Sequence, residues 1–78
     1  MKTQLTKEEF RYCCSQLNGV IPTISFKPGQ EWESIRTNIL AGEEWEPLPP
    51  DLESKLKQLT FWETIELYAQ VKQFWDEI

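Results

Sequence analysis

The last third of the chain carries its longest uninterrupted pattern of apolar positions. No Gly or Pro occurs between Thr60 and Ile78. Thr60 and Glu63 form a capping box, in which each side chain pairs a backbone amide that the first turn of a helix would leave open. The pattern predicts about eighteen residues of helix, roughly 27 Å long.

Large apolar side chains cover more of this predicted helix than a surface helix normally shows. Successive side chains lie about 100° apart, which produces two neighbouring apolar lines and one flank. The first line holds Phe61, Ile65, Tyr68 and Trp75, the second holds Leu67, Val71, Phe74 and Ile78, and the flank holds Trp62 and Ala69. The polar strip between them consists of Glu63, Glu66, Gln70, Gln73 and Glu77. Because an apolar stripe is usually little wider than about 100°, either the rest of the protein encloses this helix or some apolar surface is left for a partner.

A second amphipathic helix is predicted near the N-terminus. Thr6-Lys-Glu-Glu9 is another capping box, and Leu5 before the cap matches Phe10 at the fourth helical position as a hydrophobic staple. The helix should run from Lys7 to about Leu17 and end at Asn18-Gly19. Its inner face should hold Phe10, Cys13, Cys14 and Leu17.

The pattern changes period after this helix. From Val20 to Lys27, Ile24 and Phe26 alternate with polar side chains, and Pro28-Gly29 closes the run as a turn. This predicts a short strand or extended segment. The segment either crosses the helices as a connector, with Ile24 and Phe26 in the core, or pairs with another chain through its open edge.

Two further helices are predicted in the middle of the chain. From Glu31 to Ala41 the apolar residues fall on one side, and Gly42 supplies a stop; these residues are Trp32, Ile35 and Ile39, with Leu40 adjacent. From Asp51 to Leu59, leucine recurs at spacings of four and three, after a proline that suits a first turn. Because Thr60 starts a new helix at once, the last two helices should meet at a sharp corner.

The link between these two helices reads Glu-Glu-Trp-Glu-Pro-Leu-Pro-Pro from Glu43 to Pro50. Proline fixes its own backbone angle and favours an extended conformation in the residue before it. A semi-rigid, polyproline-like link is therefore predicted. It carries two large apolar side chains, Trp45 and Leu48.

Together these elements predict a mainly α-helical fold. Residues 1–78 should form a single small domain, with three to four short helices around a long C-terminal helix and one short extended or strand segment near residues 20–27. A chain of this length buries only about 60% of the surface that its unfolded form exposes, so modest stability is expected.

The net charge of the chain disfavours two classes of binding partner. Eight basic against thirteen acidic residues give a net charge of −5, which disfavours direct binding of nucleic acid or an anionic membrane, because both need a basic face. The N-terminus lacks the apolar run of a signal peptide. No apolar run approaches the roughly 20 residues that span a bilayer. We therefore expect a cytoplasmic protein.

Few residues are available for catalysis. The chain has no His, the commonest general base and metal ligand. Cys13 and Cys14 are adjacent and should be free thiols that act as small apolar side chains. Arg11 is the one nearby cation that could lower the pKa of Cys14. Gly-rich phosphate loops are absent as well, so we expect no enzyme activity, cofactor or metal site.

The central acidic residues raise a different class of function. They are Glu43, Glu44, Glu46, Asp51 and Glu53. Calcium needs six to eight oxygens from a loop with Asp, Asn and Gly at fixed steps, and this stretch lacks that pattern. A solvated acidic rim is favoured, and a divalent-cation sensor is kept as an alternative.

The aromatic residues mark the candidate binding surface. Four Trp, four Phe and two Tyr are a heavy load for 78 residues, and aromatic anchors ringed by polar groups resemble interface hot spots. Alternatively, the link folds back as a lid over the last helix. The candidate partner-binding residues are Trp45, Leu48, Trp62, Phe74 and Trp75, with Glu43, Glu44 and Glu46 as an acidic rim.

The function predicted from these features is a non-catalytic protein–protein interaction module, working as a small accessory subunit or regulator. The acidic rim would steer a basic protein partner. An acidic inhibitor, which mimics nucleic acid on a basic partner, is the alternative within binding, and a homodimer is also open. Burial of all four residues Trp45, Trp62, Phe74 and Trp75 inside a monomer would leave no docking surface.

Overall fold

The computed structural model describes residues 4–17, 25–42 and 47–77. In these ranges the chain forms the helices α1 (Lys7–Gln16), α2 (Glu31–Asn38), α3 (Leu52–Lys57) and α4 (Phe61–Asp76), with a 3-10 turn, η2 (Leu40–Gly42), after α2. The predicted mainly helical fold with a long C-terminal helix is confirmed. None of the helices in these ranges has the length and apolar character needed to cross a bilayer.

Both capping boxes form as the sequence predicts. At the start of α1, Thr6 N donates to Glu9 Oε1 over 2.7 Å and Glu9 N donates to Thr6 Oγ1 over 3.2 Å. The same two bonds join Thr60 and Glu63 at the start of α4, over 3.0 and 3.2 Å. Each of these helices therefore begins at the residue after its threonine.

The two middle helices are shorter than their apolar patterns predict. Asp51, expected inside α3, is its N-cap, with a left-handed backbone (φ 66°) and no capping bond from its side chain. Asp tolerates this conformation better than most residues, and the turn is closed by Leu52 N donating to Pro50 O over 2.7 Å. Helix α2 ends at Asn38, and η2 continues it in place of the predicted α-helix to Ala41.

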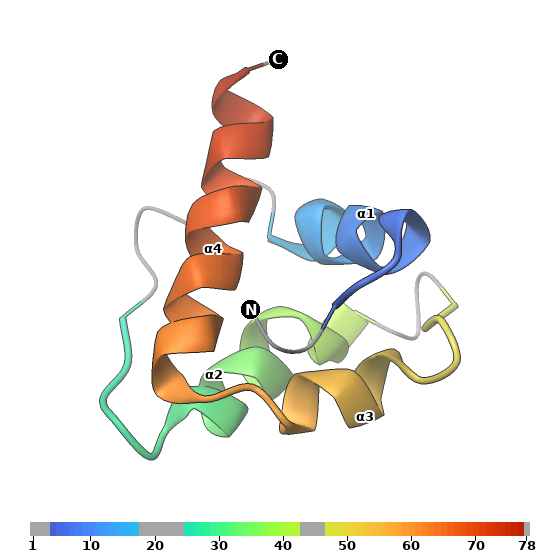
Figure 1. Cartoon of the computed structure of the whole chain (residues 1–78). Coiled ribbons are helices and arrows are strands. Elements are labelled where there is room, and N and C mark those ends of the chain that lie inside the picture. Colours follow the sequence, from blue (N-terminus) through green and yellow to red (C-terminus); the bar gives the residue numbers. More distant parts are fainter. Residues whose placement is uncertain (1–3, 18–24, 43–46, 78) are drawn as a thin grey trace.

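Helix α4 is the element on which the others are arranged. Figure 1 shows α1 beside its upper half and α2 and α3 near its lower, N-terminal end. Contacts join α1 to α4 and α2 to α3. Helices α3 and α4 meet at the sharp corner that the Thr60 cap predicts (Figure 1). As a result, only part of the circumference of α4 is covered by other helices.

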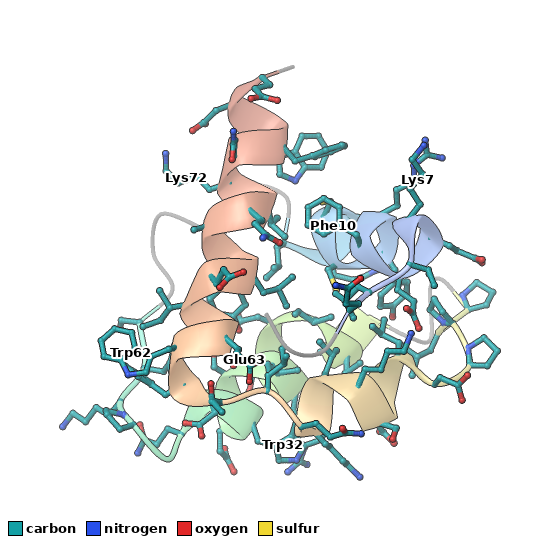
Figure 2. The ribbon with its side chains drawn as sticks, in the orientation of Figure 1. Lys7, Phe10, Trp32, Trp62, Glu63 and Lys72 are labelled. Carbon is teal, nitrogen blue, oxygen red and sulfur yellow. The ribbon has the colours of Figure 1, made fainter. Side chains whose placement is uncertain are left out.

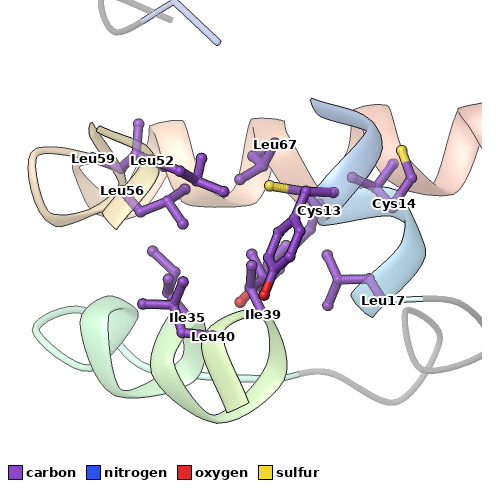
Figure 3. Close-up of a cluster of buried hydrophobic side chains, with 13 residues drawn as sticks. Cys13, Cys14, Leu17, Ile35, Ile39, Leu40, Leu52, Leu56, Leu59 and Leu67 are labelled. Atoms are coloured by element: carbon purple, nitrogen blue, oxygen red, sulfur yellow. The ribbon is translucent and has the colours of Figure 1, made fainter. Parts of the chain in front are cut away.

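The core is one cluster of buried apolar side chains to which every helix contributes (Figure 3). The predicted leucine stripe of α3 is buried, at 0% exposure for Leu52, 1% for Leu56 and 5% for Leu59. Leu67 and Val71 of α4 are both fully buried. The core members are Tyr12, Cys13, Cys14, Leu17, Ile35, Ile39, Leu40, Leu52, Leu56, Leu59, Leu67, Tyr68 and Val71.

The inner face of α1 differs from its prediction at three positions. Cys13, Cys14 and Leu17 are buried as expected, but Phe10 is only half-buried. Glu9 and Tyr12, which were not assigned to this face, are buried. Helix α1 is therefore rotated so that Phe10 lies at the edge of the core. The predicted stop at Asn18-Gly19 falls outside the described residues.

The extended segment predicted near residues 20–27 is described only from residue 25. Residues 25–27 form neither helix nor strand, and no strand occurs anywhere in the ranges given above, so this part of the fold prediction is not confirmed. Phe26 packs against the core, which is the contact that the connector interpretation assigns to it. Ile24 lies among the residues that are not described.

Candidate protein-binding surface

Two polar contacts fix α4 to its neighbours. The hydroxyls of Ser34 and Tyr68 are 2.8 Å apart in the interior and join α2 to α4. Burial raises the pKa of Tyr68, against a smaller lowering by its hydrogen bond to Ser34. Trp75 Nε1 donates to Cys14 O over 2.9 Å and joins α4 to α1. The orientation of α4 about its own axis is therefore set by specific contacts at its middle and near its C-terminal end.

A chain of aromatic rings runs from the core to the surface at the N-terminal end of α4. Phe26 lies edge-to-face on Tyr68, with ring centroids 5.7 Å apart, and on Phe61, at 5.3 Å. Phe61 contacts Trp62 in the same way at 5.2 Å. Such edge-to-face pairs are favourable beyond the area that they bury. Trp62, the outermost of these rings, is therefore supported by rings that lead back to the buried Tyr68.

Trp62 is the most exposed large apolar side chain among the residues that the structure describes. Its exposed fraction is 74%, and that of Ile65 is 38%. Ala69 is exposed as well. In Figure 2, Trp62 points away from α4 on the side opposite Phe10. We refer to Trp62, Ile65 and Ala69 as the outer face of α4.

The other predicted site residues of α4 lie closer to the core. Phe74 and Trp75 are half-buried and pack against the core cluster. Phe74 lies edge-to-face on Phe10 at 6.1 Å and on Trp75 at 5.2 Å. Phe74 and Trp75 therefore help to position α4 on α1, and only part of each ring can reach a partner.

The link residues are described only in part. Leu48 is half-buried and packs against the core cluster. Trp45 and the acidic rim of Glu43, Glu44 and Glu46 lie outside the described residues. Trp62 is exposed, so the condition that would leave no docking surface, burial of all four aromatic residues, is not met.

A groove between α1 and α4, which the sequence analysis did not predict, adds a concave surface. Its volume is about 480 Å³, and it opens to solvent. We call it the α1–α4 groove. Its apolar residues are Leu5, Phe10 and Phe74, and its polar residues are Thr6, Lys7, Gln70, Gln73 and Glu77. The hydrophobic staple and Phe74 were visible in the sequence, but the groove exists only because α1 packs beside this part of α4.

The polar strip of α4 lies between the groove and the outer face, and three of its residues also line the groove. Four of its five predicted residues are exposed, namely Glu66, Gln70, Gln73 and Glu77, and Glu63 is half-buried. Helix α4 and its C-cap carry four carboxylates, Glu63, Glu66, Asp76 and Glu77, against the single cation Lys72, a net charge of −3. Lys72 lies 2.8 Å from Asp76. This side of the molecule is therefore acidic.

The two thiols give no support to a reactive site. Burial raises the pKa of Cys13 to about 12 and that of Cys14 to about 11. The thiolate is the reactive form of cysteine, so a raised pKa lowers the reactivity of both groups near neutral pH. Burial is the cause of the raised pKa of Cys14, and both cysteines are free and buried, as expected of small apolar side chains.

The structure also bears on the cation-sensor alternative. Within residues 4–17, 25–42 and 47–77, no three or more Asp, Glu or Cys side chains come together in a way that could hold a metal ion. Asp51 and Glu53 are both exposed. The remaining members of the central acidic group are the three rim glutamates that the structure leaves undescribed.

Comparison of the sequence with protein-family models, with curated proteins and with solved structures finds no match. Function must therefore be inferred from the surface itself.

Proposed function

We propose that this protein is a non-catalytic protein-interaction module, an accessory subunit or regulator that binds a protein partner through the outer face of α4. The observation that carries the proposal is the 74% exposure of Trp62. Trp is among the residues most enriched at binding hot spots. A side chain of this size is more often at least half-buried in a monomer.

The support beneath Trp62 strengthens the proposal. The ring contacts Phe61, which is packed on Phe26, so part of its conformational freedom is already lost before a partner arrives. Binding costs roughly 0.5–1.5 kcal/mol for each flexible side chain that it immobilises. An exposed ring that is held in place avoids some of this cost and is suited to act as an anchor.

The size of the apolar surface points to a small, reversible contact. An aromatic side chain has about 150–250 Å² to bury, so at 74% exposure Trp62 offers roughly 110–185 Å². A standard interface takes about 800 Å² from each partner. Polar and charged groups around Trp62 must supply most of the remaining contact, and the acidic polar strip is adjacent.

The two alternative functions both depend on acidic side chains. A divalent-cation sensor would use the central acidic group, of which Glu43, Glu44 and Glu46 lie outside the described residues, and a nucleic-acid-mimicking inhibitor would present carboxylates in place of phosphates; both stay predictions. No contact of the described residues favours either one.

The proposal is tested by affinity capture from native lysate with immobilised wild-type protein and the Trp62→Ala variant. We expect at least one protein to be retained by the wild type and lost with Trp62→Ala. The substitution removes an exposed side chain, so circular dichroism and the melting temperature should show an intact fold.

Glu53→Ala is the matched control, because Glu53 is exposed on α3, away from the outer face. It should capture the same proteins as the wild type. Identical captured sets from wild type and Trp62→Ala would contradict the proposal.

A further inference from the structure

The α1–α4 groove has the form of a site for a side chain of another protein. Phe10 and Phe74 form its apolar wall with Leu5, and Gln70 and Gln73 are among its polar lining residues. Its volume of about 480 Å³ falls in the range of ligand pockets, about 300–1,000 Å³. A small molecule in such a site is normally enclosed over most of its surface, whereas this groove is open along its length. An open groove fits an apolar side chain that projects from a longer segment.

The charges beside the groove indicate which kind of protein segment it would bind. Glu66 and Glu77 lie on the polar strip that borders it, and both are exposed. Their hydrogen-bond partners include the neighbouring Gln70 and Gln73, at 3.4 and 3.1 Å, which can move aside for a cation. Among the described residues that line the groove, Lys7 of α1 is the only cation. Anionic membranes and nucleic acids would be repelled by the net charge of −3 on α4 and its cap.

A second copy of this chain is a poorer occupant. An antiparallel pair of α4 helices would bring the carboxylates of one copy against those of the other, and like charges across an interface are costly. Charge therefore favours a heterologous partner.

We propose that the α1–α4 groove binds a basic amphipathic segment of another protein. An apolar side chain of the segment enters the groove between Phe10 and Phe74, and its Lys or Arg residues pair with Glu66 and Glu77. This inference rests on the proposed function, since it names the class of partner and extends the surface around α4 from Trp62 to the groove.

The test uses a synthetic amphipathic helix of about 18 residues built from Leu and Lys, with Leu at helical spacing. It is titrated into the full-length, isotope-labelled protein while amide chemical shifts are recorded. We expect the shifts to concentrate at Phe10, Gln70 and Phe74. The same peptide with Glu in place of Lys should not bind, and affinity for the Lys peptide should fall as salt is raised.

Two pairs of variants locate the contact. Gln70→Lys places a cation in the lining of the groove, and Glu66 one turn earlier can pair with it, so the helix is preserved. We expect at least about tenfold weaker binding, because the new cation repels the Lys residues of the peptide and takes Glu66 as its own partner. Gln58→Lys makes the same change on α3 and should leave binding unaltered. The double variant Glu66→Gln with Glu77→Gln should weaken binding by about 2- to 25-fold. Its matched control, Glu33→Gln with Glu53→Gln, should not.

Several results would overturn the inference. Shifts spread over α2 and α3, equal binding of the Glu peptide, or equal affinity for Gln70→Lys and wild type would each remove it. Shifts at the groove that appear with rising protein concentration alone would assign the groove to a second copy instead. If the captured partners depend on Trp62 while the peptide does not map to the groove, the proposed function stands and only this inference fails.

Discussion

At the scale of single residues, Glu9 carries a buried charge that takes part in two contacts: the capping box of α1 and an ion pair with Lys55 of α3. Its Oε1 accepts a hydrogen bond from Thr6 N in the α1 cap and one from Lys55 Nζ of α3, each over 2.7 Å. Burial by itself raises the pKa of Glu9, but the hydrogen bonds from Lys55 and Thr6 outweigh it and hold the pKa below 4.5. Charged Glu9 therefore contributes stability above the unfolded pKa near 4.5, and this contribution is lost as the pH falls through the lower, folded value.

We expect Glu9→Gln to lower the free energy of unfolding at pH 7 by about 1–3 kcal/mol. Gln can still complete the capping box, so the loss reports the charge and not the cap. The difference from wild type should narrow as the pH falls below 4.5, because wild-type Glu9 then loses its charge as well. Urea unfolding over a pH series measures both effects. Glu8→Gln, at an exposed neighbouring position, is the control, and an equal loss in the two variants would contradict the assignment.

The thiols provide a second prediction at this scale. With pKa values of about 12 and 11 for Cys13 and Cys14, a very small fraction of either is thiolate at pH 8. Relative to an exposed thiol with a pKa near 8.5, we expect at least about 100-fold slower reaction with a disulfide reagent. Both thiols should react at the ordinary rate in concentrated guanidinium chloride. Fast labelling of one thiol in the folded protein would show that its burial is incomplete.

At the scale of elements, the packing of α1 on α4 determines the shape of the surface between them. The bond from Trp75 Nε1 to Cys14 O and the contact between Phe10 and Phe74 hold the two helices together. These contacts also create the walls of the α1–α4 groove. The stability of this helix pair and the shape of the groove are consequently coupled.

We expect Trp75→Phe to cost about 1–2 kcal/mol, because it removes the indole donor to Cys14 O and leaves space where the larger ring packed. Trp62→Phe makes the same chemical change at an exposed position of the same helix. That variant should stay within about 0.5 kcal/mol of wild type. Chemical unfolding of both variants measures the contrast, and equal losses would mean that the α1–α4 hydrogen bond contributes nothing.

At the scale of the whole molecule, the distribution of charge and apolar surface sets the association state. The apolar area offered by Trp62 is too small for a standard interface, and α4 with its cap carries a net charge of −3. We expect sedimentation velocity to show a monomer from about 1 to 100 μM, a range that would reveal a dimer with a dissociation constant in the micromolar range. A dimer whose strength rises with salt would indicate that charge repulsion had masked an apolar contact.

Much of the fold could be predicted from the sequence because helix starts and faces depend on residues within one or two turns. Thr6 and Glu9, like Thr60 and Glu63, are three positions apart, and they cap α1 and α4 as predicted. The leucine spacing of α3 identified its buried face. The exposed polar strip of α4 was also identified by spacing alone.

The surface depended on contacts that no local pattern contains. Ile65 and Tyr68 belong to the same predicted apolar line, yet Tyr68 is 7% exposed and Ile65 is 38% exposed. The Tyr68 ring packs against Phe26 and its hydroxyl bonds to Ser34, 34 positions away, while Ile65 keeps more than a third of its surface in solvent. The groove likewise requires α1 and α4 to pack through Cys14 and Trp75, 61 positions apart.

The sequence by itself determined that the chain is helical, where α1 and α4 begin, and that α4 has more apolar side chains than one covered face needs. Those properties follow from propensity, capping and spacing over short distances. Only the tertiary structure decided which of those side chains is left in solvent, that a groove lies beside them, and that Glu9 is buried against Lys55. Long-range packing chooses among faces that the local pattern leaves equivalent, and it is this choice that exposes Trp62.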